Sequence, residues 1–147
     1  MATVNKAELA IELGRAMQEM RNKSRQTIQL RMKENNMNLT FEMLEVLSCL
    51  WRKNGINQQE IADITLKDKS SMTYLIDNLV KRNMVKRVED ENDRRNKLIY
   101  LTDEANNLKA QLYPWVTEMY TVATEDIDAD DLTTCLNLIN KMVGNLP

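Results

Sequence analysis

The chain has 147 residues, 43% of them hydrophobic and 29% charged, with a formal net charge of −2. These values suit one ordinary globular domain, and the 3 glycines, 2 prolines and 5% aromatic residues favour helix over sheet. The lack of histidine excludes serine–histidine and cysteine–histidine catalysis and removes the commonest zinc ligand. No apolar run reaches the roughly 18 residues of a membrane span, and glutamates interrupt the N-terminal apolar pattern, so no membrane segment or signal peptide is expected. We expect a cytoplasmic protein whose 2 cysteines are reduced.

Charge is distributed unevenly along the chain. Residues 51–101 carry 11 Lys and Arg against 8 Asp and Glu, a net charge of +3. Residues 102–147 carry 2 against 8, a net charge of −6. A basic middle beside an acidic tail favours an anion-binding segment on a scaffold, although chance variation of a protein surface gives the same pattern.

The N-terminal third is predicted to be helical. Apolar residues that recur every three or four positions predict an amphipathic helix over about residues 5–34. These residues are Leu9, Leu13, Met17 and Met20. Thr40 is placed to cap a second helix over about residues 41–53, which Asn54-Gly55 ends. Its inward face comprises Leu44, Leu47 and Leu50 or Trp51.

The middle of the chain predicts a short helix, a longer helix and a β-hairpin. Asn57 and Glu60 have the spacing of a capping box, and the helix that they open should bury Ile61 and Ile64. A second helix over about residues 69–83 carries one apolar stripe. The stripe consists of Met72, Leu75, Ile76 and Leu79. Asn83, which tolerates a left-handed backbone, ends this helix, and the segments MVKRV and KLIYL then alternate as strands around the polar turn EDENDRR.

The C-terminal third returns to helix. Thr102 can cap a helix whose apolar residues step by 4, 3, 4 and 3, as in a coiled-coil seam, with a bend at Pro114. The seam comprises Leu108, Leu112, Trp115, Met119 and Val122. Asp128 can cap a last helix. Its apolar face comprises Leu132, Cys135, Leu136, Ile139, Met142 and Val143. Cys49 and Cys135 are expected to be small core residues.

A short helix, a tight turn and a second helix with polar residues at its start form a helix-turn-helix, whose second helix can enter a DNA major groove. The hairpin that follows carries Arg94 and Arg95 at its tip. Such a wing can reach the adjacent minor groove, whose negative potential attracts arginine. Many helix pairs share this spacing without binding DNA, so the wing is the more informative part of the pattern.

Residues 68–105 resemble the core of the MarR family of regulators. The family pattern at the wing is met by Asp93, Arg95, Ile99, Leu101 and Thr102, and the resemblance extends to LTFEMLEVL, INQQEIADI and the terminal helices. It implies a mainly α fold with a small β-hairpin, in one domain over residues 1–147. The winged helix-turn-helix would occupy about residues 38–101, and helices in about 1–34 and 102–147 would form a homodimer.

The resemblance also implies a function. Two recognition helices of a dimer would enter double-stranded DNA at a pseudo-palindromic site, and the protein would regulate transcription as a repressor that a small phenolic or lipophilic effector releases. We expect no enzyme activity, cofactor, metal or membrane partner. The alternative is a regulator-like dimer with weakened DNA binding that acts through protein partners or as a ligand-binding module.

The residues expected to contact DNA lie on the recognition helix and the wing. They are Lys67, Lys69, Ser70, Ser71, Thr73, Tyr74, Asn78, Asp93, Arg94 and Arg95. Asp93 and Arg95 are two residues apart, so on a strand they share a side, and the Asp93 carboxylate should hold the Arg95 guanidinium toward the minor groove. Helix capping and a solvated hairpin tip are the structural alternatives. Tyr74 and Asn78 depart from the family, which often has arginine at both positions.

The chain also offers a candidate effector pocket. Met17, Met20, Met43 and Trp51 fall on helices that in this family flank an effector cavity, and methionine-rich walls adapt to apolar ligands. Plain core packing produces the same pattern. Some family members sense oxidants through a cysteine in the first helix, and this chain has none there.

Overall fold

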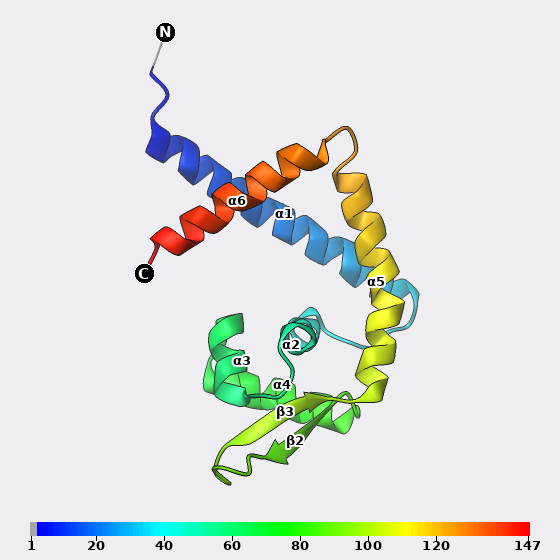
Figure 1. Cartoon of the computed structure of the whole chain (residues 1–147). Coiled ribbons are helices and arrows are strands. Elements are labelled where there is room, and N and C mark those ends of the chain that lie inside the picture. The colour runs from blue at the N-terminus through cyan, green and yellow to red at the C-terminus, as the bar shows by residue number, and fades with distance from the viewer. Residues whose placement is uncertain (1–2) are drawn as a thin grey trace. The chain divides into compact units, whose positions relative to one another are not determined.

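The computed structural model describes residues 3–147, which form six helices and a small three-stranded sheet. Figure 1 shows these elements along the chain. This is the mainly α fold with a β-hairpin that the sequence predicts. The elements are α1 (Lys6–Glu34), α2 (Phe41–Arg52), β1 (Ile56–Asn57), α3 (Gln58–Thr65), α4 (Lys69–Lys81), β2 (Val85–Glu89), β3 (Lys97–Leu101), α5 (Asp103–Ala123) and α6 (Ala129–Asn145). None of the helices within residues 3–147 is both long and apolar enough to span a bilayer.

The chain divides into two compact units. The first ends at Trp115 and contains the helix-turn-helix, the sheet and the start of α5. The second, Val116–Pro147, contains the end of α5 and all of α6. Pro114 lies inside α5, one residue before the first unit ends.

Short polar side chains begin most of the helices. The side chain of Thr40 accepts from the Met43 N–H at 3.2 Å, and that of Asn57 accepts from the Glu60 N–H at 2.8 Å. These bonds satisfy amides that have no partner inside the helix, as the sequence predicts. Asp128 precedes α6 in an extended backbone conformation, but its side chain makes no capping hydrogen bond.

The core of the first unit lies among α2, α3, α4 and the sheet. The whole predicted stripe of α4 is buried, which confirms the inward face of this helix. Ile61 of α3 is also fully buried, but Ile64 is 57% exposed, so its predicted burial is wrong. The buried face of α3 is centred between Ile61 and Ala62, and at about 100° per residue Ile64 lies far round the helix from that centre.

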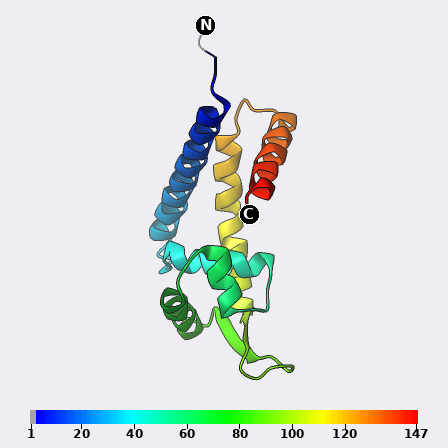
Figure 2. The same ribbon diagram turned by 90° about the vertical axis from the view of Figure 1, so that its left-hand side faces the viewer.

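The sheet is antiparallel, with strand order β1-β3-β2. The predicted hairpin pairs Val85 with Leu101 at one end and Glu89 with Lys97 at the other. In Figure 2 this hairpin extends away from α2–α4, with its turn at the far end. The sequence did not indicate β1, whose two residues are too few to show an alternating pattern.

Gly55 makes the β1–β3 pairing possible. Its N–H donates to the Ile99 carbonyl at 3.0 Å, and its backbone is left-handed with φ of +72°. The preceding Asn54 accepts from the Leu101 N–H at 2.9 Å through its side-chain oxygen. The connection between α2 and α3 therefore holds the wing through β3.

Thr102 connects the hairpin, α4 and α5. Its hydroxyl lies 2.7 Å from the Asn83 carbonyl and 3.1 Å from the Met84 carbonyl, and it accepts from the Ala105 N–H at 3.2 Å. Asn83 adopts the predicted left-handed conformation, with φ of +57°. These bonds join the end of α4 to the start of α5.

The apolar faces of the terminal helices are exposed in the single chain. On α1 the four predicted stripe residues are 36–59% exposed, and in α6 no residue is buried. Cys49 is buried as predicted, whereas Cys135 on α6 is exposed. The expectation that Cys135 is a core residue is wrong for the single chain, because nothing covers its helix face there.

Candidate nucleic-acid interface

The start of α4 presents polar side chains to solvent. Asp68 caps this helix by accepting from the Ser71 N–H at 2.7 Å and from the Ser71 hydroxyl at 3.0 Å. The Ser71 N–H, followed by its hydroxyl, lowers the pKa of the Asp68 carboxyl. Lys69, Ser70 and Tyr74 are exposed beside it. The structure thus gives Ser71 a capping role, while its neighbours remain open to a ligand.

Thr73 is tied to the preceding helix. Its hydroxyl donates to the Lys69 carbonyl at 3.0 Å and accepts from the Gln58 side-chain amide at 2.7 Å. The Asn78 amide donates to the Tyr74 carbonyl at 2.8 Å. Sequence reasoning missed Gln58, although its place directly after the capping Asn57 shows that it begins α3.

Lys67 lies against α2 instead of standing beside Lys69. Its ammonium is 3.5 Å from a carboxylate oxygen of Glu45, and its side chain is only 17% exposed. Arg21 pairs with the other oxygen of the same carboxylate at 3.1 Å. In the free chain Lys67 is therefore paired with Glu45 of α2, and its expected contact with DNA stays a prediction.

The tip of the wing is a hydrogen-bonded turn. The Asp93 N–H donates to the Asp90 carbonyl at 3.2 Å, and the Asn96 N–H donates to the Asp93 carbonyl at 2.9 Å. The Asp93 carboxylate accepts from the Arg95 backbone N–H at 3.1 Å. No ion pair joins the Asp93 carboxylate to the Arg95 guanidinium within residues 3–147. The predicted side-chain pairing assumed a strand, and this segment is a turn, where alternation does not apply.

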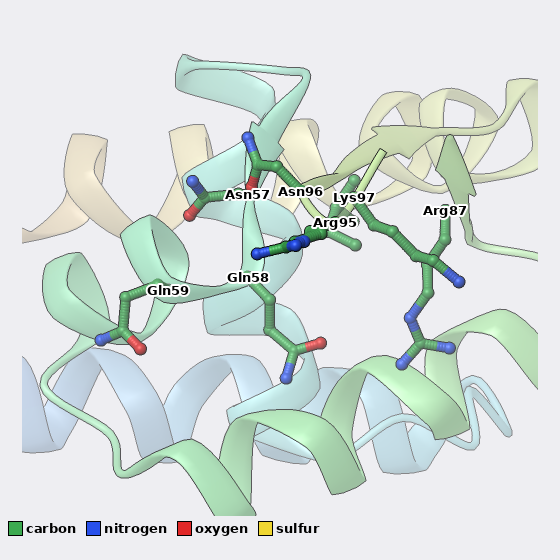
Figure 3. Close-up of a pocket in the computed structure, with 8 residues that line it drawn as sticks. Asn57, Gln58, Gln59, Arg87, Arg95, Asn96 and Lys97 are labelled. Carbon is green, nitrogen blue, oxygen red and sulfur yellow. The ribbon is translucent and has the colours of Figure 1, made fainter. Parts of the chain in front are cut away.

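A polar hollow of about 270 Å³ lies between the start of α3 and the wing. Its lining residues are Asn57, Gln58, Gln59, Arg87, Arg95, Asn96, Lys97 and Ile99 (Figure 3). In Figure 3 the Arg95 side chain extends toward Gln58. Arg94 is exposed but does not line the hollow. The cations that gather here are thus Arg95, which the sequence predicts, and Arg87 and Lys97, which it does not.

The register of the hairpin explains the position of Arg87. Val85 and Arg87 are two residues apart on β2, so their side chains share a face. Arg87 stands opposite Ile99 on β3. Opposed residues of an antiparallel pair share a face, so Arg87 lies on the side of the buried Val85 and Ile99, facing the helices. There its guanidinium pairs with the carboxylate of Asp77 on α4. The alternation in VKRVE could have indicated this arginine.

The four residues proposed for an effector pocket differ in burial, and their role stays a prediction. Met17 and Met20 are 36% and 40% exposed on the N-terminal half of α1, whereas Met43 on α2 is buried. Trp51 is half-buried, and its ring N–H is buried without a hydrogen-bond partner among the described residues. None of the four lines the polar hollow. The first buried residue of α1 is Ile28, so Met17 and Met20 lie in the part of this helix that has no buried residue.

Across residues 3–147, no group of three or more His, Cys, Asp or Glu side chains is placed to hold a metal ion.

Comparison with known proteins finds similar sequences for the middle of the chain. The MarR family model matches residues 39–97, which contain the helix-turn-helix and most of the wing. The HTH-type transcriptional regulator TtmR of Methylorubrum extorquens is 32% identical over 74 residues, or 50% of this chain and 38% of TtmR. The HTH-type transcriptional regulator MgrA of Staphylococcus aureus is 27% identical over 75 residues, or 51% of each protein. The aligned part of this chain therefore spans about half the length of these relatives or less.

Solved structures resemble this chain over more residues than the sequence matches do. A mutant of MarR from E. coli, complexed with operator DNA, superposes with a TM-score of 0.74 at 23% identity. The superposition covers 98% of this chain and 100% of that one. The chain thus matches the MarR family model over residues 39–97, and it shares the winged-helix fold of this E. coli regulator.

Proposed function

We propose that this chain is a cytoplasmic, sequence-specific DNA-binding regulator of transcription. The observation that carries the proposal is the cationic hollow of Arg87, Arg95 and Lys97 beside the exposed start of α4. A helix of this kind can enter the major groove while neighbouring cations contact phosphates or the minor groove. The relatives TtmR and MgrA are named as transcriptional regulators, and the structure of E. coli MarR holds operator DNA.

We propose that the active form is a homodimer. The exposed apolar stripe of α1 and the uncovered apolar face of α6 would each be buried against a second copy. A symmetric dimer would present its recognition helices to two half-sites one helical turn apart, on a pseudo-palindromic site. Sedimentation tests this directly, and a monomer at micromolar concentration would contradict it.

The proposal extends to repression that a small phenolic or lipophilic effector relieves. Resemblance to the family supports this part, and the methionines and Trp51 proposed for an effector pocket are its candidate residues. The measurement is release of bound operator when such compounds are added. If no compound of either class changes operator affinity at millimolar concentration, effector control by these classes is rejected.

A second candidate function is a regulator-like dimer with weakened DNA binding. Lys67 is paired with Glu45, Arg87 is paired with Asp77, and Tyr74 stands where the family often has arginine. Each feature reduces the cationic contacts available to phosphate.

Binding to a random duplex separates the two functions. A fluorescently labelled duplex is titrated with the protein at several salt concentrations, and affinity is read by anisotropy. For the DNA-binding regulator we expect binding that weakens steeply with salt, because each phosphate contact releases counterions. No binding even at low salt would reject DNA binding and favour the second function.

A further inference from the structure

The hollow beside the wing concentrates positive charge that the fold must accommodate. Arg87, Arg95 and Lys97 all line it. Like charges that line one hollow repel one another, and this repulsion opposes the folded arrangement unless a counter-charge is present. Among the ion pairs within residues 3–147, the one that reaches these three cations joins Arg87 to Asp77.

Asp77 occupies a position at which a carboxylate is unfavourable for DNA binding. It lies on the recognition helix one turn after Thr73, outside the buried stripe, and its side chain is 49% exposed. A carboxylate on this face approaches the phosphates of any duplex that α4 enters. The Arg87 side chain is 29% exposed and is directed to α4 by the register of β2. Asp77 therefore meets the cation that DNA phosphate would otherwise attract.

We propose that Asp77 is an internal counter-charge that lowers the affinity of this protein for DNA by occupying Arg87. The inference rests on the proposed DNA-binding function. In the free protein, Asp77 neutralises one cation of the hollow and holds Arg87 against α4. A DNA phosphate that approaches the hollow competes with the Asp77 carboxylate for the same guanidinium.

The competition is possible because the pair is weak. An ion pair with this much solvent exposure is screened and contributes little stability, so a phosphate can displace it. A backbone phosphate contact also releases counterions, which the internal pair cannot do. Asp77 thus reduces non-specific binding most, since that binding depends on phosphate contacts alone.

The test is Asp77→Asn, which keeps the size of the side chain and removes its charge. Affinity of the full chain for a random duplex is measured by anisotropy across a salt series. We expect tighter binding at low salt and a salt slope that is steeper by about 0.9, the value for one further phosphate contact. An unchanged or weaker affinity would overturn the proposal, and the latter would show that the pair positions the wing for binding.

A double-variant cycle tests whether the effect passes through Arg87. We expect Asp77→Asn to give no gain in an Arg87→Ala background, since the cation that it releases is absent. A full gain in that background would show simple repulsion between Asp77 and DNA, and would overturn the role assigned to Arg87. Circular dichroism confirms that each variant retains its helices.

Asp63→Asn is the matched control for net charge. Asp63 is exposed on α3, and its carboxylate accepts from the Gln59 amide at 2.9 Å. The Asp63→Asn variant removes the same charge as Asp77→Asn, but Asp63 does not contact the wing. The salt slope of DNA binding by this variant should therefore stay at the wild-type value. A gain equal to that of Asp77→Asn would reject a specific counter-charge. If the wild-type protein does not bind at low salt, the proposed function fails; if it binds and Asp77→Asn matches it, only this inference fails.

Discussion

Gly55→Ala is expected to loosen the attachment of the wing to the helical core. Gly55 has φ of +72°, a conformation that costs a residue with a Cβ about 1–2 kcal/mol. A Cβ placed there would lie 2.7 Å from Tyr100 Cε1, 2.7 Å from Cζ and 2.9 Å from the hydroxyl oxygen. These distances are too short for non-bonded atoms, so the Tyr100 ring must move.

The expected loss of stability follows from these two effects. A side chain forced away from its rotamer costs about 0.5–1.5 kcal/mol. Added to the backbone strain, this predicts that Gly55→Ala lowers the free energy of unfolding by about 1.5–3.5 kcal/mol. Urea denaturation followed by circular dichroism measures it, with an unchanged slope expected if the variant still unfolds in one step.

Two further variants test the reasoning. Gly14 in α1 has nothing within 4 Å of an added Cβ, so Gly14→Ala should raise stability by up to about 1 kcal/mol through helix propensity. Adding Tyr100→Ala to Gly55→Ala should recover the part of the loss that comes from the clash, relative to Tyr100→Ala alone. A Gly55→Ala variant within about 0.5 kcal/mol of the wild type would refute the strain argument.

Four other outcomes are expected. Arg95→Ala should weaken binding to DNA by about tenfold while leaving the dimer intact in sedimentation, and an equal loss of dimerisation would contradict the wing assignment. Thr40→Ala removes the cap of α2 and should cost about 1 kcal/mol in urea denaturation, whereas no change would show that solvent replaces the cap. Burial raises the pKa of the Cys49 thiol, so an alkylating reagent should modify Cys49 only after unfolding, and rapid modification of the folded protein would contradict its burial. The folded pKa of Asp68 lies below its ordinary value of 3.8, so its contribution to stability is present above that pH and is lost as the pH falls through the folded pKa. As the pH is lowered, Asp68→Asn should therefore lose less of its free energy of unfolding than the wild type. If both proteins lose the same amount, the Asp68 carboxylate does not cause this part of the pH dependence.

Local signals were sufficient to predict the helices and the hairpin. Thr40 and Asn57 cap helices because a short polar side chain can reach an amide three residues ahead, and this needs no tertiary information. The stripe on α4 was also predictable, since one apolar face at helical spacing must be covered. Asn83 ends α4 in a left-handed conformation that few other residue types adopt readily.

The candidate site was less predictable, because its contacts join residues far apart in the chain. Lys67 turns to Glu45, and Gln58 reaches Thr73, through the packing of α2, α3 and α4. The pairing of Arg87 with Asp77 depends on the register of β2 and on the orientation of α4 together. The polar residues of the recognition helix contain none of this information by themselves, so the sequence did not indicate that Asp77 pairs with Arg87.

The bonds around Thr102 connect the ends of three secondary-structure elements. A rotation at the start of α5 displaces Thr102, and with it the Asn83 and Met84 carbonyls that hold the C-terminus of α4 and the start of β2. The first turn of α5 is therefore hydrogen-bonded, through Thr102, to the residues that directly follow the recognition helix. In a dimer built on the terminal helices, the spacing of the two recognition helices would follow the angle of α5, so this hydroxyl would transmit a change in quaternary geometry to the DNA-facing surface.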